Sequence, residues 1–139
     1  FDKNAVYPCG KRIPAEHYRA CSIDDSYASP AVSLCTDVNG ILQIDGLALN
    51  QWMDYKINIL SGVKDFQIRY TATRDSEITI YKVDENGNET ALQTIALPST
   101  ASKTAWTTLT ESFTPEAGEQ VLRLKCTKGL PRINWFKLK

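Results

Sequence analysis

The sequence predicts an all-β fold, a β-sandwich or a barrel. Three observations lead to this prediction: short segments in which apolar and polar residues alternate, turn residues between those segments, and no helix-like periodicity longer than about two turns. When apolar and polar residues alternate with a two-residue period, one face of the strand points to a core and the other face points to water. The length of 139 residues fits a single domain, in which residues 1–11 form a lead-in.

The strands follow one another along the chain with turn signals between them. The alternating or threonine-rich segments cover residues 51–57, 66–72, 77–83, 105–110 and 121–126. Asn86-Gly87 lies between two strand patterns and predicts a β-hairpin. Residues 21–40 break this rhythm with a segment longer than ~12–15 residues, and loops of that length are usually functional or disordered.

The last eight residues, 132–139, predict one more strand that ends with the chain. Apolar Ile133 and Trp135, with Phe136 beside it, share this short segment with basic and amide residues. A domain that finishes on a strand must pair it with an earlier segment, and residues 12–18 are the natural partner. The two ends of the chain then close one self-contained module.

Composition excludes several classes of partner. Sixteen basic and sixteen acidic residues give a net charge of zero, so we expect no nucleic-acid partner and no membrane surface. No apolar run approaches the ~20 residues of a membrane span. The chain starts at Phe1, and we therefore expect a piece of a longer, processed precursor.

The four cysteines are too scattered for a structural zinc site. Their even number favours two disulfides and an oxidising compartment, which predicts a secreted, extracellular protein. Three connectivities exist, and we favour Cys21–Cys35 with Cys9–Cys126. The alternative is four buried free thiols, since cysteine is often a small core residue.

An ordered series of short motifs resembles the carbohydrate-binding modules of family 6. The resemblance runs from about Arg12 to Lys139 and implies a β-sandwich of the jelly-roll type, a non-catalytic module appended to secreted polysaccharide-degrading enzymes. The motifs, in order, are Ile13-Pro14-Ala15-Glu16-His17-Tyr18, Gln43-Ile44-Asp45, Trp52-Met53-Asp54-Tyr55, Arg69-Tyr70-Thr71-Ala72, Pro98-Ser99-Thr100, Ala105-Trp106-Thr107-Thr108, Ala117-Gly118, Leu122-Arg123-Leu124 and Ile133-Asn134-Trp135-Phe136.

The resemblance implies a sugar cleft between two aromatic walls, with one polar residue that hydrogen-bonds the sugar. It assigns one wall to Trp106 and the other to Tyr27, the only aromatic residue between Cys21 and Cys35. The polar position, usually Asn, holds Arg132, which can only donate hydrogen bonds. Flat rings suit the apolar face of a sugar. The structural alternatives are a core Trp106, an inert loop Tyr27 and a solvated Arg132.

The resemblance also implies a structural Ca²⁺ site. Glu16 would be its carboxylate ligand and Asn134 a neutral amide ligand, with backbone carbonyls completing the oxygen set. Pro14 stands where the family has a further side-chain ligand, which weakens the site. The alternative is that Glu16 pairs with a nearby Lys or Arg. We read Trp52 and Trp135 as core residues, because they alternate with polar residues inside strands.

The leading function is a monomeric module without catalytic residues that binds a polysaccharide and targets an attached glycoside hydrolase to it. A β-glucan such as laminarin is the first ligand expected, and agarose or xylan are the alternatives. A small glycoside hydrolase would need two carboxylates across a cleft, and no pair at strand ends supports this. A protein-interaction or adhesion sandwich is the alternative of another class.

Overall fold

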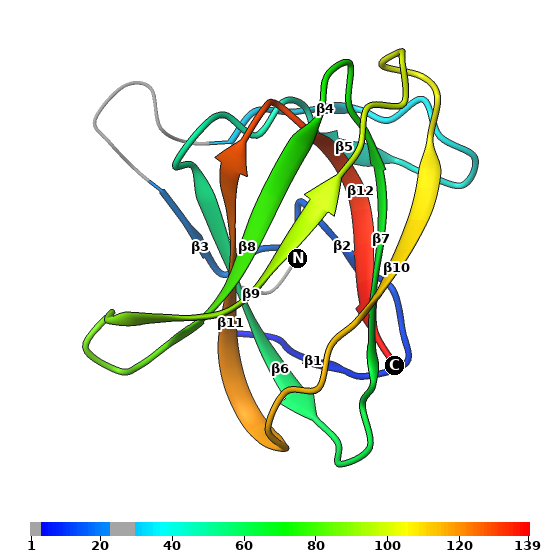
Figure 1. Cartoon of the computed structure of the whole chain (residues 1–139). Helices are drawn as coiled ribbons and strands as arrows, with labels where there is room; N and C mark the ends of the chain where they lie inside the picture. Colours follow the sequence, from blue (N-terminus) through cyan, green and yellow to red (C-terminus); the bar gives the residue numbers. More distant parts are fainter. Residues whose placement is uncertain (1–3, 23–29) are drawn as a thin grey trace.

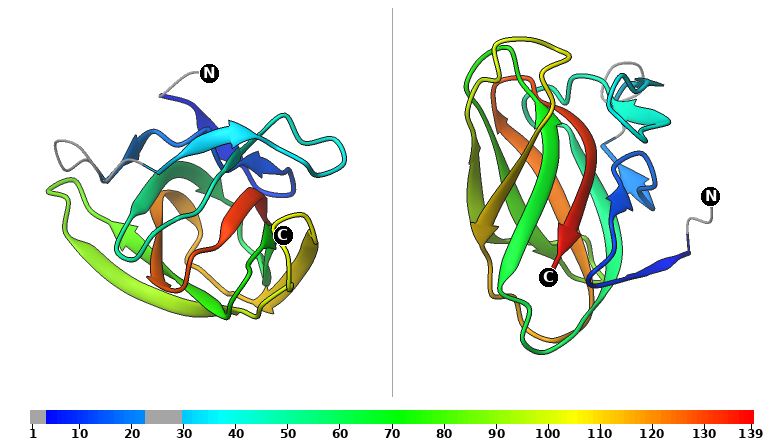
Figure 2. Two further views of the ribbon diagram at one scale, coloured as in Figure 1. Left: turned by 90° about the horizontal axis from the view of Figure 1, so that it is seen from above. Right: turned by 90° about the vertical axis from the view of Figure 1, so that its right-hand side faces the viewer.

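The computed structural model describes residues 4–22 and 30–139 as strands joined by turns and loops (Figure 1). Two sheets pack face to face, so the predicted β-sandwich is confirmed. Within the described residues no helix is long and apolar enough to cross a membrane. The described residues 6–22 and 30–44 lie together along one side of the sandwich (Figure 2).

Sheet A contains six strands, and all of its paired neighbours are antiparallel except the first pair, β1 with β6. The short strand β3 pairs with β6 beside the main path. In spatial order the main path is β1 (Val6–Pro8), β6 (Trp52–Ile59), β11 (Gly118–Lys128), β8 (Ser76–Val83) and β9 (Glu89–Leu97), and β3 covers Ala20–Cys21.

Sheet B also contains six strands and is antiparallel throughout. The terminal strand β12 lies inside this sheet, with β7 on one side and both β5 and β2 on the other. In spatial order the strands are β10 (Thr107–Ser112), β7 (Asp65–Thr71), β12 (Arg132–Leu138), β5 (Leu42–Ile44) and β4 (Val32–Leu34), and β2 covers Ile13–Pro14.

The predicted pairing of the two chain ends is confirmed. Strand β2 pairs with β12 so that Ile13 faces Phe136 and Pro14 faces Trp135. The hairpin at Asn86-Gly87 is also present, because it joins β8 to β9 and the Gly87 N–H donates to the Asp84 carbonyl at 3.0 Å. The segment 21–40 is less irregular than expected, since it contains β4.

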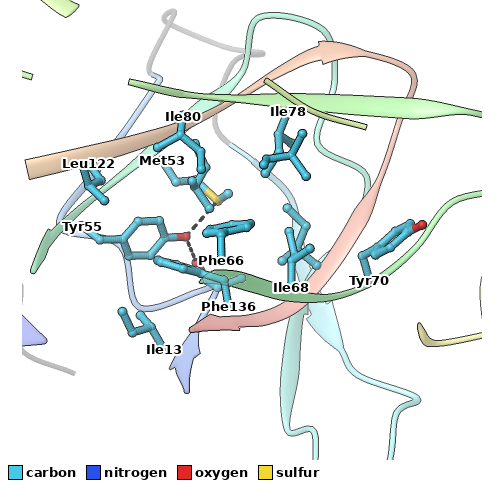
Figure 3. Close-up of a cluster of buried hydrophobic side chains, with 14 of the residues drawn as sticks. Ile13, Met53, Tyr55, Phe66, Ile68, Tyr70, Ile78, Ile80, Leu122 and Phe136 are labelled. Atoms are coloured by element: carbon cyan, nitrogen blue, oxygen red, sulfur yellow. Dashed lines mark hydrogen bonds between the residues drawn. The ribbon is translucent and has the colours of Figure 1, made fainter. Parts of the chain in front are cut away.

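The core lies between the inner faces of the two sheets, and Figure 3 shows part of it. Tyr55 points from β6 into this layer, and its ring meets the edge of Phe136 with centroids 4.7 Å apart. Its hydroxyl donates to the Ala15 carbonyl at 2.5 Å. The buried polar atom is thereby satisfied, and β6 is tied to the segment that follows β2.

The prediction of Trp52 as a core residue is wrong, and Trp135 is buried without joining the core cluster. The strand alternation has the opposite phase: Met53 and Tyr55 point inward, so Trp52 lies on the outer face of sheet A. There the Arg123 guanidinium stacks on the Trp52 ring at 3.6 Å. Arg12 covers the outward ring of Trp135 at 4.4 Å in the same way. Long basic side chains shield these rings from water.

The favoured disulfides are absent, because all four cysteines are free. Cys9 follows the end of β1, level with Asn58, whereas the Cys126 N–H donates to the carbonyl of Gln51. Seven residues of β6 separate these levels by about 23 Å, and a disulfide needs Cα atoms within about 7 Å.

The Cys21–Cys35 pair fails for a different reason. Cys21 belongs to β3 at the edge of sheet A, while Cys35 follows β4 at the edge of sheet B. There the Cys35 Sγ accepts the N–H of Asp37 at 3.4 Å.

Candidate functional site

Trp106 stands immediately before β10 and is partly exposed, so it is not a core residue. Its Nε1–H donates to the Thr36 Oγ1 at 2.9 Å, across 70 positions of sequence. Thr36 belongs to the connection between β4 and β5. The indole therefore sits at a partly open position, with its polar edge already fixed by the protein.

Trp106 and Arg132 flank the same residue of the central strand. Thr107 pairs with Tyr70, so Trp106 continues the ladder opposite Thr71, and Arg132 pairs with Thr71 from the other side. Strands lie about 4.8 Å apart, which places the Cα atoms of Trp106 and Arg132 about 10 Å apart. Side chains at paired positions share a face of the sheet. The sequence-predicted pair is thus brought together on the outer face of sheet B.

Arg132 is not the solvated charge of the structural alternative, because its side chain is buried. Its Nε donates to the Asp45 Oδ1 at 2.9 Å, and the Ser33 hydroxyl donates to the Asp45 Oδ2 at 3.1 Å. Asp45 therefore neutralises the guanidinium and fixes its direction. The Arg132 Nη1 has no hydrogen-bond partner among the described residues.

Three buried polar atoms without partners lie on three neighbouring strands of sheet B. They are the Gln43 Oε1 on β5, the Arg132 Nη1 on β12 and the Thr71 Oγ1 on β7, and only one further unpaired atom of this kind occurs among the described residues. Buried polar groups are normally hydrogen-bonded. One donor and two acceptor-capable oxygens without partners therefore point to partners from outside the chain, such as water or a bound ligand.

Sequence reasoning assigned no role to Thr36, Gln43 or Asp45. Gln43 in β5 and Asp45 directly after it are two residues apart, so they face the same side of the sheet, and this spacing was the available signal. Thr36 carried no signal, because its contact with Trp106 joins distant parts of the chain. Tyr27, the predicted second aromatic wall, lies outside the described residues.

Glu16 and Asn134, the predicted metal ligands, lie together at a second place on sheet B. Both line a cavity of about 310 Å³, together with Pro14 and Gly40. The Glu16 side chain is 10% exposed, and its nearest described basic group is the His17 Nε2 at 4.0 Å. Burial raises the pKa of Glu16. Its Oε1 has no partner, so pairing with Lys or Arg is not what the described residues show.

Asn134 is held by its neighbours at an irregular point of β12. The register of β12 against β7 shifts between Ile133 and Trp135, which marks Asn134 as the residue of a β-bulge. Its carbonyl accepts the Ala15 N–H at 2.9 Å, and its Nδ2 donates to the Asp37 Oδ2 at 2.9 Å. Because the amide nitrogen faces Asp37, the amide oxygen remains available as a ligand.

Asp37 connects the two places. Its carboxylate accepts from the Arg69 Nε at 2.9 Å and from the Arg69 Nη2 at 3.0 Å. These hydrogen bonds from Arg69 hold the pKa of Asp37 below its ordinary value. Burial acts in the opposite direction but is the smaller effect, and the hydrogen bond from the Asn134 amide lowers the pKa further. The turn that carries Thr36 is therefore anchored to β7 by an ion pair.

The fold and the partly open outer face define a β-sandwich with a candidate ligand site, and the comparison with known proteins gives its class. Residues 15–139 match the sequence profile of the carbohydrate binding module (family 6), and the chain belongs to this family of non-catalytic modules. Among curated proteins no sequence is similar enough to count as a match.

Several solved structures share the fold. A β-1,3-glucan binding family 6 module from Bacillus halodurans is 19% identical, with a TM-score of 0.82 over 97% of this chain and 99% of that one. A family 6 module from Clostridium stercorarium in complex with cellobiose is 19% identical, with a TM-score of 0.79 over 98% of each chain.

One similar structure belongs to a larger enzyme. It is a family 43 arabinoxylan arabinofuranohydrolase from Bacillus subtilis in complex with cellotetraose, 14% identical, with a TM-score of 0.79. The match covers 97% of this chain and 28% of that one, so the similar part is a minor portion of that enzyme.

Proposed function

We propose that this module binds a polysaccharide at Trp106 and holds an attached glycoside hydrolase close to its substrate. The observation that carries the proposal is the partly exposed Trp106 indole, fixed at its Nε1 by Thr36 and lying on the same face as the unpaired Arg132 Nη1. A protein kept near an insoluble chain gains effective concentration without any new catalytic group. Secretion and a monomeric state belong to the same proposal.

The chemistry of a sugar suits this arrangement. A pyranose ring presents an apolar face of C–H groups, and an indole stacks on that face. Hydroxyls around the ring both donate and accept, so a donor such as Arg132 and acceptors such as Gln43 and Thr71 complement it. Asp45 neutralises Arg132, which favours a neutral sugar over an anionic one.

We rank a β-glucan such as laminarin first among ligands, with agarose and xylan as the alternatives. The fold similarity to the β-1,3-glucan binding module from Bacillus halodurans supports this order. One stacked ring and a few exchangeable hydrogen bonds give modest affinity, with a Kd on the order of micromolar to millimolar.

A polysaccharide panel followed by calorimetry tests the proposal. Wild type should bind at least one of laminarin, agarose and xylan, and Trp106→Ala should lose about tenfold or more in affinity. Tyr81→Ala is the matched control, since Tyr81 is a partly exposed aromatic on sheet A. A wild type that binds no glycan, or a Trp106→Ala variant that binds as well as wild type, refutes the proposal and favours a protein-interaction sandwich.

We also propose that Glu16 and Asn134 hold a structural Ca²⁺. The support is the unpaired Glu16 Oε1, whose burial makes an ionised carboxylate unfavourable without a cation. When bound, the ion would supply positive charge to Glu16 and tie the residues after β2 to β12. One carboxylate and one amide are few ligands for an ion that takes 6–8 oxygens, so affinity should be weak.

A further inference from the structure

The connection between β4 and β5 contacts Trp106 through one residue, and its next residue is anchored to β7. Thr36 accepts the indole N–H of Trp106, and Asp37 accepts two N–H groups of Arg69. Arg69 lies in β7, between β10 and β12. The contact that orients the candidate binding residue is therefore adjacent to an ion pair that the proposed function does not use.

The Arg69 guanidinium also reaches the strand that follows Trp106. Its Nη1 donates to the Thr108 Oγ1 at 3.3 Å, while Nε and Nη2 hold Asp37. Thr108 is two residues after Trp106, so it points to the same face of β10. One planar cation thus joins both segments whose contact fixes the indole: the turn with Thr36 and the start of β10.

Asp37 is held in place by hydrogen bonds at all of its polar groups. Its side chain is 4% exposed, and its oxygens accept four N–H groups: two from Arg69, one from the Val38 backbone and one from the Asn134 amide. Its own backbone N–H donates to the Cys35 Sγ, and its carbonyl accepts the Gly40 N–H. Every polar group of Asp37 is therefore engaged, which makes Thr36 a fixed acceptor and not a mobile one.

We propose that Arg69 and Asp37 form a clamp that positions Trp106 for glycan binding, with Arg69 as a positioning residue that does not touch the ligand. The inference rests on the proposed function for its effect on affinity, but not for its effect on the indole. A ring held in its binding orientation before the ligand arrives loses less rotational freedom on binding. Without the clamp, the Trp106 indole is still present but is no longer held in its binding orientation.

The simpler hypothesis is that the Arg69–Asp37 ion pair only stabilises the fold. A second ion pair of the same geometry distinguishes this hypothesis from the clamp. Arg123 and Asp54 form the same two-pronged contact on sheet A, at 2.7 and 3.0 Å. The Arg123 side chain is 10% exposed against 27% for Arg69, so it is the more buried of the two. Arg69→Lys and Arg123→Lys both keep the charge and lose the fork.

The first measurement needs no ligand. The indole N–H resonance of Trp106 is one of three in the ¹⁵N–¹H spectrum and is assigned with Trp106→Phe. Arg69→Lys should shift this resonance and speed its exchange with water, as Thr36→Val does directly. Arg123→Lys should lower the melting temperature more and leave the Trp106 resonance in place. An unmoved resonance in Arg69→Lys overturns the clamp.

The second measurement is calorimetry with the best glycan from the panel. Arg69→Lys and Thr36→Val should each weaken binding about three- to tenfold, the net effect of one hydrogen bond. The double variant should lose no more than the worse single variant, because both act on one indole. Losses that multiply in the double variant contradict a shared route through Trp106. If wild type binds no glycan, the proposed function fails. The indole N–H resonance of Trp106 still shows whether Arg69 and Asp37 fix the orientation of the ring.

Discussion

Arg123→Met gives the sharpest test of how sheet A is held together. The Arg123 guanidinium lies between two carboxylates and an indole: it holds both oxygens of Asp54, contacts the Glu89 Oε2 at 3.0 Å and covers the ring of Trp52. Methionine replaces the apolar stem and leaves the Asp54 carboxylate, 8% exposed, without its cation. The change therefore removes one partner of a nearly buried pair and keeps most of the packing.

The expected loss in the free energy of unfolding is about 3 kcal/mol. Breaking a buried pair from one side costs about 3–5 kcal/mol, and the lower end applies because Asp54 is not fully enclosed. The Glu89 contact adds at most about 1 kcal/mol, since Glu89 is 30% exposed. For a chain of 139 residues, 1 kcal/mol corresponds to about 3 °C in melting temperature. Arg123→Met should thus melt about 10 °C lower.

Urea unfolding followed by circular dichroism and tryptophan fluorescence measures this loss. The double variant Asp54→Leu with Arg123→Met should recover most of it, because an apolar pair can replace a buried ion pair at little cost. A loss below about 1 kcal/mol for the single variant would show that the pair is solvated and weak. A double variant less stable than the single one would refute the idea that an unpaired Asp54 causes the loss.

Acid should weaken the same network from the Glu89 side. Burial opposes ionisation of Glu89, but hydrogen bonds from Lys125 and Arg123 outweigh it and hold the pKa of Glu89 below its ordinary value. A carboxyl with a lowered folded-state pKa stabilises the fold above its unfolded pKa, and that stability is lost as the pH falls through the folded value. The gap between wild type and Glu89→Gln should therefore close below about pH 4.

Three further predictions concern the proposed calcium site, the packing at Gly40 and the cysteines. Ca²⁺ should raise the melting temperature of wild type and a chelator should lower it, whereas Glu16→Gln should respond to neither; a wild type indifferent to both contradicts the calcium proposal. Gly40→Ala should cost about 1–3 kcal/mol, because a Cβ there would lie 2.6 Å from the Cys35 Sγ, and Cys35→Ala should relieve part of this cost in the double variant. Dithiothreitol should leave the melting temperature unchanged, since all four cysteines are free; a fall would reveal a disulfide.

The sequence predicted most of the long strands because each is long enough for alternation to repeat. Strands β6, β7, β8, β10, β11 and β12 overlap the expected segments, whereas the nine-residue β9 was implied only by the hairpin at Asn86-Gly87. The strands β1, β3, β4 and β5 were not predicted, since two or three residues carry no measurable period. They exist because neighbouring strands offer them an unpaired edge, which is a property of the assembled sheet.

The phase of the alternation was harder to predict than its presence. In β6, Trp52 was interpreted as a core residue because it alternates with polar residues inside a strand. The structure turns Met53 and Tyr55 inward, and Arg123 from β11 supplies the cover that makes an outward Trp52 stable. That cover comes from 71 positions away in the chain, so no local pattern could reveal it.

The sequence predicted the residues of the candidate site but not the partners that hold them in place. Trp106 and Arg132 were identified from motifs, and the structure brings them to one face of sheet B. The partners that fix them, Thr36 and Asp45, are 70 and 87 positions distant. Sequence reasoning also left open that Arg132 is a solvated charge, and its buried side chain, paired with Asp45, removes that alternative.

The position of β12 explains why one part of the site needs a clamp and the other does not. Arg132 and Asn134 project from a strand with neighbours on both sides, so the sheet itself fixes their backbone. Trp106 precedes β10, which is the edge strand of sheet B, and has no such neighbour beyond it. A binding residue at an edge needs a second anchor to be held as precisely as one in a central strand. Arg69 lies on the strand between them, and its bonds to Asp37 and Thr108 extend the rigidity of the centre to the edge.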